Sequence, residues 1–235
     1  MLKLVIGNKN YSSWSLRPWL LLRQLGLPFE EVCMHIDGFE PTSSFKQAIA
    51  QLSPTGKVPC LIDGAVRVWE SIAIAEYVAD LYPDAGVWPR DRVARAYARR
   101  ACAEMHAGFS ALRMHCPMNI ELHMPEVGAR LQRDNEAVAR DVARIDALFR
   151  DALEGTQGPM LYGAFSAADA FYAPVATRIR SYGLTVSSVS AAYVERVFAL
   201  SAMQEWTHGA LREHTPVPMS ELYRPLPLAL PAGSE

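Results

Sequence analysis

The chain has 235 residues, half of them hydrophobic, with 23 basic and 25 acidic residues and a formal net charge of −2. This length and apolar content suit one large domain or two small ones and exclude an intrinsically disordered chain. The balanced charge argues against a surface for polyanions, so no nucleic acid is expected as a partner.

The first eighty residues alternate between strand and helix patterns. Short apolar runs predict strands, while a 3.6-residue apolar period with glycine or proline at its ends predicts helices. Asp63-Gly64 lies between two apolar runs and predicts a hairpin. The predicted elements are a strand at 2–7, a helix at 15–25 capped by Ser15, a strand at 29–36, a short helix or irregular turn at 42–52, strands at 60–62 and 66–69, and a helix at 71–81. The order βαβαββα indicates a small α/β domain over residues 1–82.

The rest of the chain has helical patterns. Prolines and a glycine predict a linker at 83–91. The predicted helices cover 92–116, 125–153, 166–182, 193–200 and 202–212. From Pro216 onward the prolines predict an extended strap. The sequence therefore predicts an all-α domain over 92–235 with an extended C-terminal tail.

Two neighbouring segments have the features of a ligand site. Proline cannot donate to a sheet, so Pro59 before an apolar strand predicts a special geometry, such as a cis Val58-Pro59 bond. The backbone of Val58 would then be free to pair with a ligand. Glu70-Ser71, at the start of a predicted helix, can hold an ammonium and a carboxylate. A peptide-like ligand is one interpretation, and an ordinary turn, strand and helix cap is the other.

The cysteines and the first residues bear on metal binding and location. The four cysteines form no CxxC pair and no metal-ligand spacing, so no metal is expected. Residues 1–7 are too short an apolar run for a signal peptide, and no stretch reaches the length of a membrane span. These features predict a soluble cytoplasmic protein that does not enter a membrane.

Three motifs, in this order, resemble those of the cytosolic glutathione transferases. Residues 12–17 (SSWSLR) are similar to the active-site loop of the serine-type classes, closest to zeta and tau-like bacterial members. Residues 57–59 with Glu70-Ser71 are similar to the glutathione-binding segment, including its cis proline. Ser166-x-x-Asp169 is similar to the capping box of the family's central helix. The resemblance covers roughly residues 2–212 and implies a thioredoxin-like N-terminal domain followed by an all-α domain.

The resemblance implies that the chain uses glutathione as a co-substrate and stabilises its thiolate. A hydroxyl donor and a helix N-terminus both favour the thiolate of a group whose free pKa is about 8.5. In similar enzymes the working residue lies five positions before the arginine, which selects Ser12, with Ser13 as the alternative. Both serines could instead satisfy only loop amides.

The resemblance also implies the other glutathione contacts. The backbone of Val58, before the cis Pro59, would pair with the cysteinyl part as an added strand. Glu70 would face the γ-glutamyl ammonium, and Ser71 would bind the γ-glutamyl carboxylate. Lys57 would reach the glycyl carboxylate, or else it is a solvated lysine beside a turn.

The second substrate, a small hydrophobic electrophile, is expected to meet the sulfur from the helical domain. Its candidate pocket residues are Trp14, Met105, Phe109 and Arg113, with core packing as the alternative for each. Arg17 could bind a carboxylate or could pair on the first helix. His106 is expected to be a satisfied histidine between helices.

One departure from the family pattern narrows the range of reactions that the resemblance implies. Trp14 stands where the zeta class usually has cysteine, which disfavours thiol–disulfide chemistry. The predicted function is that of a glutathione transferase in detoxification, acting as a homodimer. The alternatives are a maleylacetoacetate-type cis-trans isomerase and a non-catalytic binding or scaffold protein on the same fold.

Overall fold

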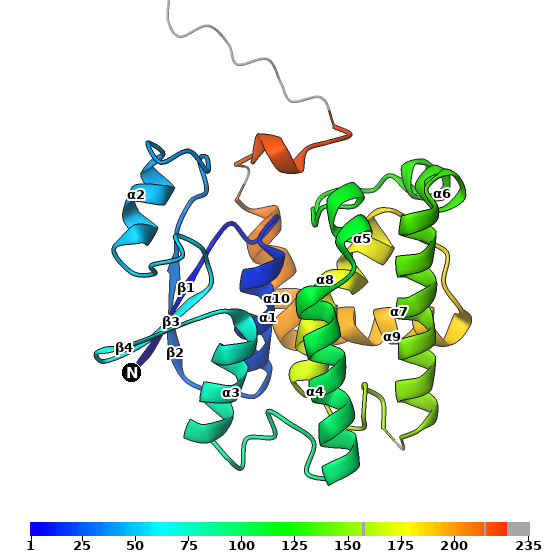
Figure 1. Cartoon of the computed structure of the whole chain (residues 1–235), viewed down its shortest axis with the longest axis horizontal. Helices are drawn as coiled ribbons and strands as arrows, with labels where there is room; N and C mark the ends of the chain where they lie inside the picture. Colours follow the sequence, from blue (N-terminus) through cyan, green and yellow to red (C-terminus); the bar gives the residue numbers. More distant parts are fainter. Residues whose placement is uncertain (157, 214, 225–235) are drawn as a thin grey trace, which may run out of the picture.

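The computed structural model describes residues 1–156, 158–213 and 215–224. A four-stranded sheet with its helices lies beside a group of helices (Figure 1). The elements are β1 (Leu2–Ile6), α1 (Ser13–Gln24), β2 (Phe29–Cys33), α2 (Ser44–Ala50), β3 (Cys60–Asp63), β4 (Val66–Trp69), α3 (Ser71–Leu81), α4 (Arg92–Ala107), α5 (Ser110–His115), α6 (Pro125–Asp134), α7 (Glu136–Glu154), α8 (Ala167–Ser181), α9 (Ser188–Ala199), α10 (Ser201–Leu211) and the 3₁₀-helix η1 (Pro218–Ser220). The predicted architecture, a thioredoxin-like domain followed by helices, is confirmed.

The sheet has the order β2-β1-β3-β4, and only the β1–β2 pair is parallel. Alternate residues of its strands face two different layers. Leu4 and Leu61 belong to the main core with α1 and α3, whereas Val5 and Cys60 pack with α2. Gly64 takes a positive φ of 55° in the β3–β4 hairpin, as Asp63-Gly64 predicts.

The start of the first helix differs from the prediction. Ser12, not Ser15, occupies the N-cap position of α1. The Ser15 hydroxyl is instead turned into the fold, where it accepts a hydrogen bond from the Gly7 amide at 3.0 Å. The second strand also ends earlier than predicted, at Cys33.

Two long predicted helices are each divided in the structure. The predicted helix 92–116 is α4 followed by α5, because Phe109 takes a left-handed conformation with φ 57°. The predicted helix 125–153 is α6 followed by α7, because the Asn135 side chain caps α7 by accepting from the amides of Ala137 and Val138. Both breaks reorient the chain at residues whose local conformation stops the helix.

The later elements agree in kind with the prediction but not in every boundary. No helix or strand lies between α3 and α4, in the predicted linker region. The helix predicted from residue 193 begins at Ser188, capped by Ser187. The predicted strap contains η1, and its residues 225–235 lie outside the described residues. No helix in the described part of the chain combines the length and apolar character that a bilayer span requires.

The predicted capping box of the central helix α8 is confirmed. Asp169 is fully buried and accepts from the amides of Ser166 and Leu161, each at 2.9 Å. The Tyr193 hydroxyl of α9 donates to the same carboxyl group at 3.0 Å. The carboxyl group of Asp169 therefore joins the start of α8 to the preceding loop and to α9.

Replacing Asp169 by alanine should lower the free energy of unfolding by about 3 kcal/mol or more, because it leaves three buried donors without an acceptor. Urea denaturation measures the loss. Asn135→Ala is the matched control, a half-buried N-cap whose loss costs about 1 kcal/mol. Equal losses in the two variants would contradict the role assigned to Asp169.

Candidate active site

A cavity of about 440 Å³ opens where the loops of the sheet domain meet the helices and the C-terminal segment. It gathers residues from six separate parts of the chain. Its lining consists of Tyr11, Ser12, Ser13, Trp14, Ile36, Phe39, Phe45, Lys46, Thr55, Lys57, Val58, Pro59, Trp69, Glu70, Ser71, Arg113, Val217 and Ser220. Nine of the eleven candidate residues from the sequence are in this lining.

The two candidate serines lie side by side at the N-terminus of α1. Ser12 is the N-cap residue, and its hydroxyl donates to the Ser15 hydroxyl at 2.7 Å. Ser13 is the first residue of the helix and is half-buried. Both line the cavity, and both lie where the first-turn amides and the helix dipole favour a negative charge. An anionic sulfur placed here would be stabilised by either hydroxyl.

Glu70 and Ser71 line the same cavity at the start of α3. Glu70 takes a positive φ of 67°, a strained conformation for a residue other than glycine. Ser71 is the first residue of α3. It is buried from solvent and forms part of the cavity lining. The Val58-Pro59 peptide, predicted to be cis, is cis, and both residues line the same cavity.

Arg17 is a buried cation with no acidic partner. It is 1% exposed and takes part in no ion pair among the described residues, so the predicted pairing on the first helix is wrong. Its Nη1 donates to the Ser71 hydroxyl at 3.5 Å, while no described atom accepts from its Nε. Burial and then the neighbouring Arg178 and Arg113 lower the pKa of Arg17 to about 9. The protein therefore holds an unbalanced positive charge just behind Ser71.

Trp14 lies between two guanidinium groups. The Arg17 group is 4.0 Å from the centre of its ring and the Arg113 group is 4.8 Å from it. The His106 ring meets it edge-on at 5.2 Å. These contacts hold the indole on the cavity wall, next to the two serines.

His106 links the helical part to Glu70. Its Nε2 lies 3.4 Å from a Glu70 carboxylate oxygen, and its buried Nδ1 has no hydrogen-bond partner among the described residues. Burial and the neighbouring Arg17 lower the pKa of His106. The expected satisfied histidine between helices is therefore wrong, since one ring nitrogen is buried without a partner and the other meets Glu70 before α3.

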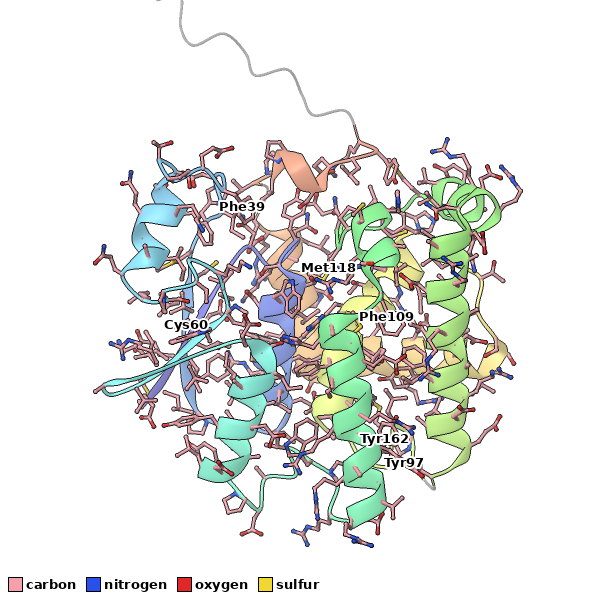
Figure 2. The ribbon with its side chains drawn as sticks, in the orientation of Figure 1. Phe39, Cys60, Tyr97, Phe109, Met118 and Tyr162 are labelled. Atoms are coloured by element: carbon pink, nitrogen blue, oxygen red, sulfur yellow. The ribbon has the colours of Figure 1, made fainter. Side chains whose placement is uncertain are left out.

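Two of the predicted pocket residues belong to the core and do not line the cavity. Met105 is fully buried, and Phe109 is 6% exposed and packs edge-on against Tyr172 of α8. Figure 2 labels Phe109 at the junction of α4 and α5 and Phe39 beside α2. Phe109 follows Met105 by four residues and, like Met105, is directed into the core between the helices.

The cavity also contains residues that the sequence did not single out. Lys46 of α2 donates to the Gly56 carbonyl at 2.7 Å, and it shares the cavity with the exposed Lys57. Tyr11 precedes Ser12, and Val217 belongs to the C-terminal segment. Of these residues, only Tyr11 could have been found from the sequence, because it adjoins the serines. Lys46 and Val217 come from distant segments of the chain.

Comparisons with known proteins show what the fold and the sequence resemble. The architecture is that of a glutathione transferase homologue from Burkholderia gl BGR1 with bound glutathione, at a TM-score of 0.67 and 24% identity over 89% of this chain and 98% of that one. A family model described as "Glutathione S-transferase, N-terminal domain" matches residues 11–81. Residues 11–81 thus resemble the N-terminal domain of the glutathione S-transferases, and the chain has the fold of such an enzyme, as its motifs predict.

Two curated relatives are similar to part of this chain. A probable maleylacetoacetate isomerase from Caenorhabditis elegans is 30% identical over 101 residues, which are 43% of this chain and 44% of the relative. Glutathione S-transferase Z2 from Arabidopsis thaliana is 32% identical over 105 residues, 43% of this chain and 45% of the relative. The chain thus spans less than half the length of these relatives.

Arg17→Met should raise the free energy of unfolding by about 1–2 kcal/mol, because an apolar side chain of similar length replaces a buried charge that has no counter-charge. Arg178→Met is the matched control. Arg178 is equally buried but donates to the carbonyls of Cys116 and Pro174, so its loss should cost about 2 kcal/mol. Urea denaturation measures the free energy of unfolding of both variants. A loss of stability in Arg17→Met would contradict the conclusion that Arg17 carries an unbalanced buried charge.

Proposed function

We propose that this protein is a glutathione transferase that binds glutathione in the cavity, stabilises its thiolate with a serine hydroxyl and directs it at a small hydrophobic electrophile. One observation carries the proposal. The serine loop, the Val58 segment and Glu70–Ser71, which are far apart in the sequence, line a single cavity. The structural relative from Burkholderia, described with bound glutathione, supports the choice of ligand.

The γ-glutamyl end of glutathione would bind at Ser71 and Glu70. The Ser71 hydroxyl and the first amides of α3 suit a carboxylate, and the Glu70 carboxylate suits the ammonium beside it. The Arg17 guanidinium donates to the Ser71 hydroxyl and would supply the positive charge that balances the ligand carboxylate. The buried cation is costly in the free protein and would be balanced only when this anion binds.

The rest of the tripeptide would follow the cavity wall. The backbone of Val58 would pair with the cysteinyl part in the manner of an added strand. Lys57 and Lys46, which both line the cavity, would supply positive charge for the glycyl carboxylate. The ligand would thus be held at both charged ends, which places its sulfur between them.

The sulfur would then face Ser12 and Ser13. For Ser12 to donate to a thiolate, its proton must turn away from Ser15, and the Ser15 hydroxyl can donate back to Ser12 because a hydroxyl both donates and accepts. The Gly7 amide keeps the Ser15 oxygen in place. The N-terminus of α1 and the positive charges of Arg17 and Arg113 would also lower the thiol pKa.

The electrophile would approach along Trp14 and Arg113. Trp14 is partly exposed and lines the cavity together with the serines. Nucleophilic attack by the thiolate on the electrophile, with loss of a leaving group or addition to a double bond, gives the glutathione conjugate. Met105 and Phe109 would support this wall from the core and would not touch the substrate.

Cis-trans isomerisation of a maleylacetoacetate-type substrate is the second candidate function. Arg113 lines the cavity and takes part in no ion pair among the described residues, so it can receive a substrate carboxylate. One relative is named as a probable maleylacetoacetate isomerase. In this reaction the thiolate would add to the double bond and leave again, so glutathione is regenerated.

A second copy of the chain is the expected partner. Val93 and Tyr97 lie one helical turn apart on α4 and are 51% and 46% exposed, which leaves apolar surface for such a contact. The domain boundaries at 82 and 92, a cytoplasmic location and a role in detoxification stay predictions from the sequence.

Ser12→Ala should raise the pKa of the thiol of bound glutathione by about one unit, a loss of about 1.4 kcal/mol of thiolate stabilisation. Titration of the ultraviolet absorbance of the thiolate measures it. Ser13→Ala is the matched control and should change the pKa less. The reverse order would transfer the role to Ser13, and no change in either variant would remove the serine mechanism.

The function itself is tested by binding and turnover. Calorimetry should detect glutathione binding, and Glu70→Ala should weaken it about ten-fold or more, or about 1.4 kcal/mol. Glu76→Ala is the control on the same helix, because Glu76 pairs with Arg99 and lies outside the cavity lining. Conjugation of a chloronitrobenzene supports the transferase, and turnover of only an unsaturated diacid supports the isomerase. Absence of glutathione binding would overturn both.

A further inference from the structure

The C-terminal segment 215–224 forms part of the cavity wall. Val217 is 4% exposed and packs with Tyr11, Ile36 and Phe45 against the α2 side of the sheet. Val217 and Ser220 also line the cavity. The segment appears in red above the ends of α1 and α10 in Figure 1. The segment 215–224 therefore lies against Tyr11, in the loop that precedes α1.

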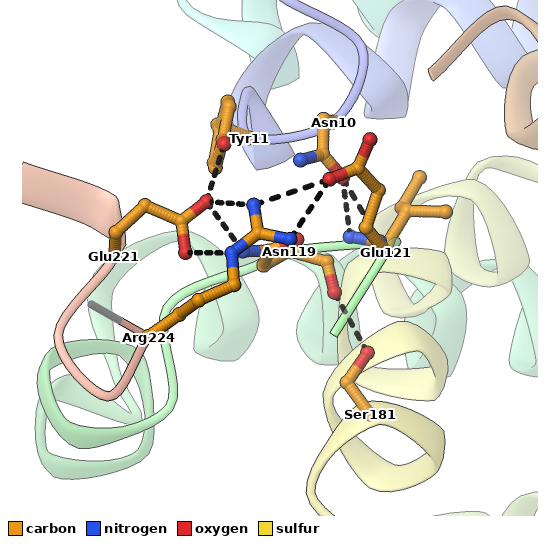
Figure 3. Close-up of polar contacts among 8 residues, drawn as sticks. Asn10, Tyr11, Asn119, Glu121, Ser181, Glu221 and Arg224 are labelled. Atoms are coloured by element: carbon orange, nitrogen blue, oxygen red, sulfur yellow. Dashed lines mark hydrogen bonds and ion pairs between the residues drawn. The ribbon is translucent and has the colours of Figure 1, made fainter. Parts of the chain in front are cut away.

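A buried carboxylate anchors this segment. The Glu221 side chain has no exposed surface and accepts four hydrogen bonds (Figure 3). Tyr11 Oη donates at 2.5 Å and Asn119 Nδ2 at 3.0 Å, both to Oε1. Arg224 donates Nη2 to Oε1 at 2.6 Å and Nε to Oε2 at 3.0 Å. The charge is thus both paired and hydrogen-bonded, as burial requires.

The contacts of this anchor lead directly to the serine loop. Tyr11 is the residue before Ser12, and its ring lines the cavity. The Asn10 side chain accepts from the amides of Ile120 and Glu121, at 2.7 and 3.1 Å (Figure 3). The Glu213 carboxylate accepts from the backbone amides of Lys9 and Asn10 in the same loop. Distant parts of the chain therefore hold residues 9–11 immediately before the serines.

We propose that Glu221 is a positioning residue that acts through Tyr11 to hold Ser12 and Ser13 at the place where the thiolate forms. This inference rests on the proposed function of the site. Ser12 has φ −80° and ψ 83°, outside the helical region, so its placement depends on the loop before it as well as on α1. Burial and then Glu221 raise the pKa of Tyr11 to about 12, so the phenol stays a donor at neutral pH.

Two substitutions break the same contact from its two ends. Tyr11→Phe removes the hydroxyl and keeps the ring on the cavity wall, whereas Glu221→Ala removes the acceptor. Each should raise the pKa of the bound glutathione thiol and lower kcat about ten-fold or more, because a small displacement of a catalytic group has a large effect on rate. The KM for glutathione should change less than kcat, since the residues that hold the ligand are elsewhere.

The route through Tyr11 is tested by combination and rescue. The double variant should be no worse in kcat than Glu221→Ala alone, because both substitutions remove one contact. Glu221→Gln should restore part of the lost activity, since its amide oxygen can still accept from Tyr11. A double variant whose losses simply add would contradict this route.

Glu121→Gln is the matched control for a merely structural role. It weakens the other pair of Arg224, at 3.1 Å, and leaves the Tyr11–Glu221 contact intact. It should lower Tm without shifting the thiol pKa. The inference is overturned if Tyr11→Phe leaves the thiol pKa and kcat unchanged, or if Glu121→Gln shifts them as much as Tyr11→Phe does. If Glu221→Ala does not fold, the result for Tyr11→Phe alone tests the inference. A parent protein that binds no glutathione would overturn the proposed function as well, whereas a parent with a lowered thiol pKa and unaffected variants would overturn the positioning role alone.

Discussion

Helix α1 is buried continuously from Ser15 to Leu22, because it lies between the sheet and the helical bundle. It packs against α3 on one side and against α8 and α10 on the other. A helix with no solvent-facing side in its middle can neither rotate nor slide without exposing apolar surface or creating voids. Its N-terminus, which carries Ser12 and Ser13, is consequently fixed relative to both halves of the molecule.

The same constraint explains the unusual arginine. Residue 17 lies in the buried part of α1, so its guanidinium cannot reach solvent and is directed between Ser71, Trp14 and Phe171. The nearby Arg113 and Arg178 add positive charge. A folded protein keeps such a group at a cost in stability, which is understandable where the group serves an anionic ligand. The charge pattern of the cavity and the proposed binding of glutathione are thus two consequences of one packing arrangement.

The C-terminal segment adds a second constraint on the same loop. The Glu221 side chain is fully buried, yet both of its carboxylate oxygens accept hydrogen bonds. Its partners belong to the serine loop, to the α5–α6 connection and to its own segment (Figure 3), so the contact joins these three parts of the chain. The position of the serine loop therefore depends on a residue more than two hundred positions away in the chain as well as on its neighbours.

The sequence by itself determined the features that depend on local chemistry. The βαβαββα order, the Asp63-Gly64 hairpin, the capping box at Ser166 and Asp169, and the serine loop followed by Val58-Pro59 and Glu70-Ser71 are all readable from residue type and spacing. Asn135 before an acidic residue was also a readable N-cap signal that the long apolar period obscured.

Only the tertiary structure decided the features that depend on packing between distant segments. The left-handed conformation of Phe109 ends α4 and starts α5, which carries Arg113 on the cavity wall, while Met105 and Phe109 lie in the core. The lack of an acidic partner for Arg17, the unpaired nitrogen of His106 and the contact of Glu221 with Tyr11 depend on which groups meet in three dimensions. Hydrophobic periodicity specifies which face of a helix is buried, but not which side chain it meets there, because that is set by the packing of the whole chain.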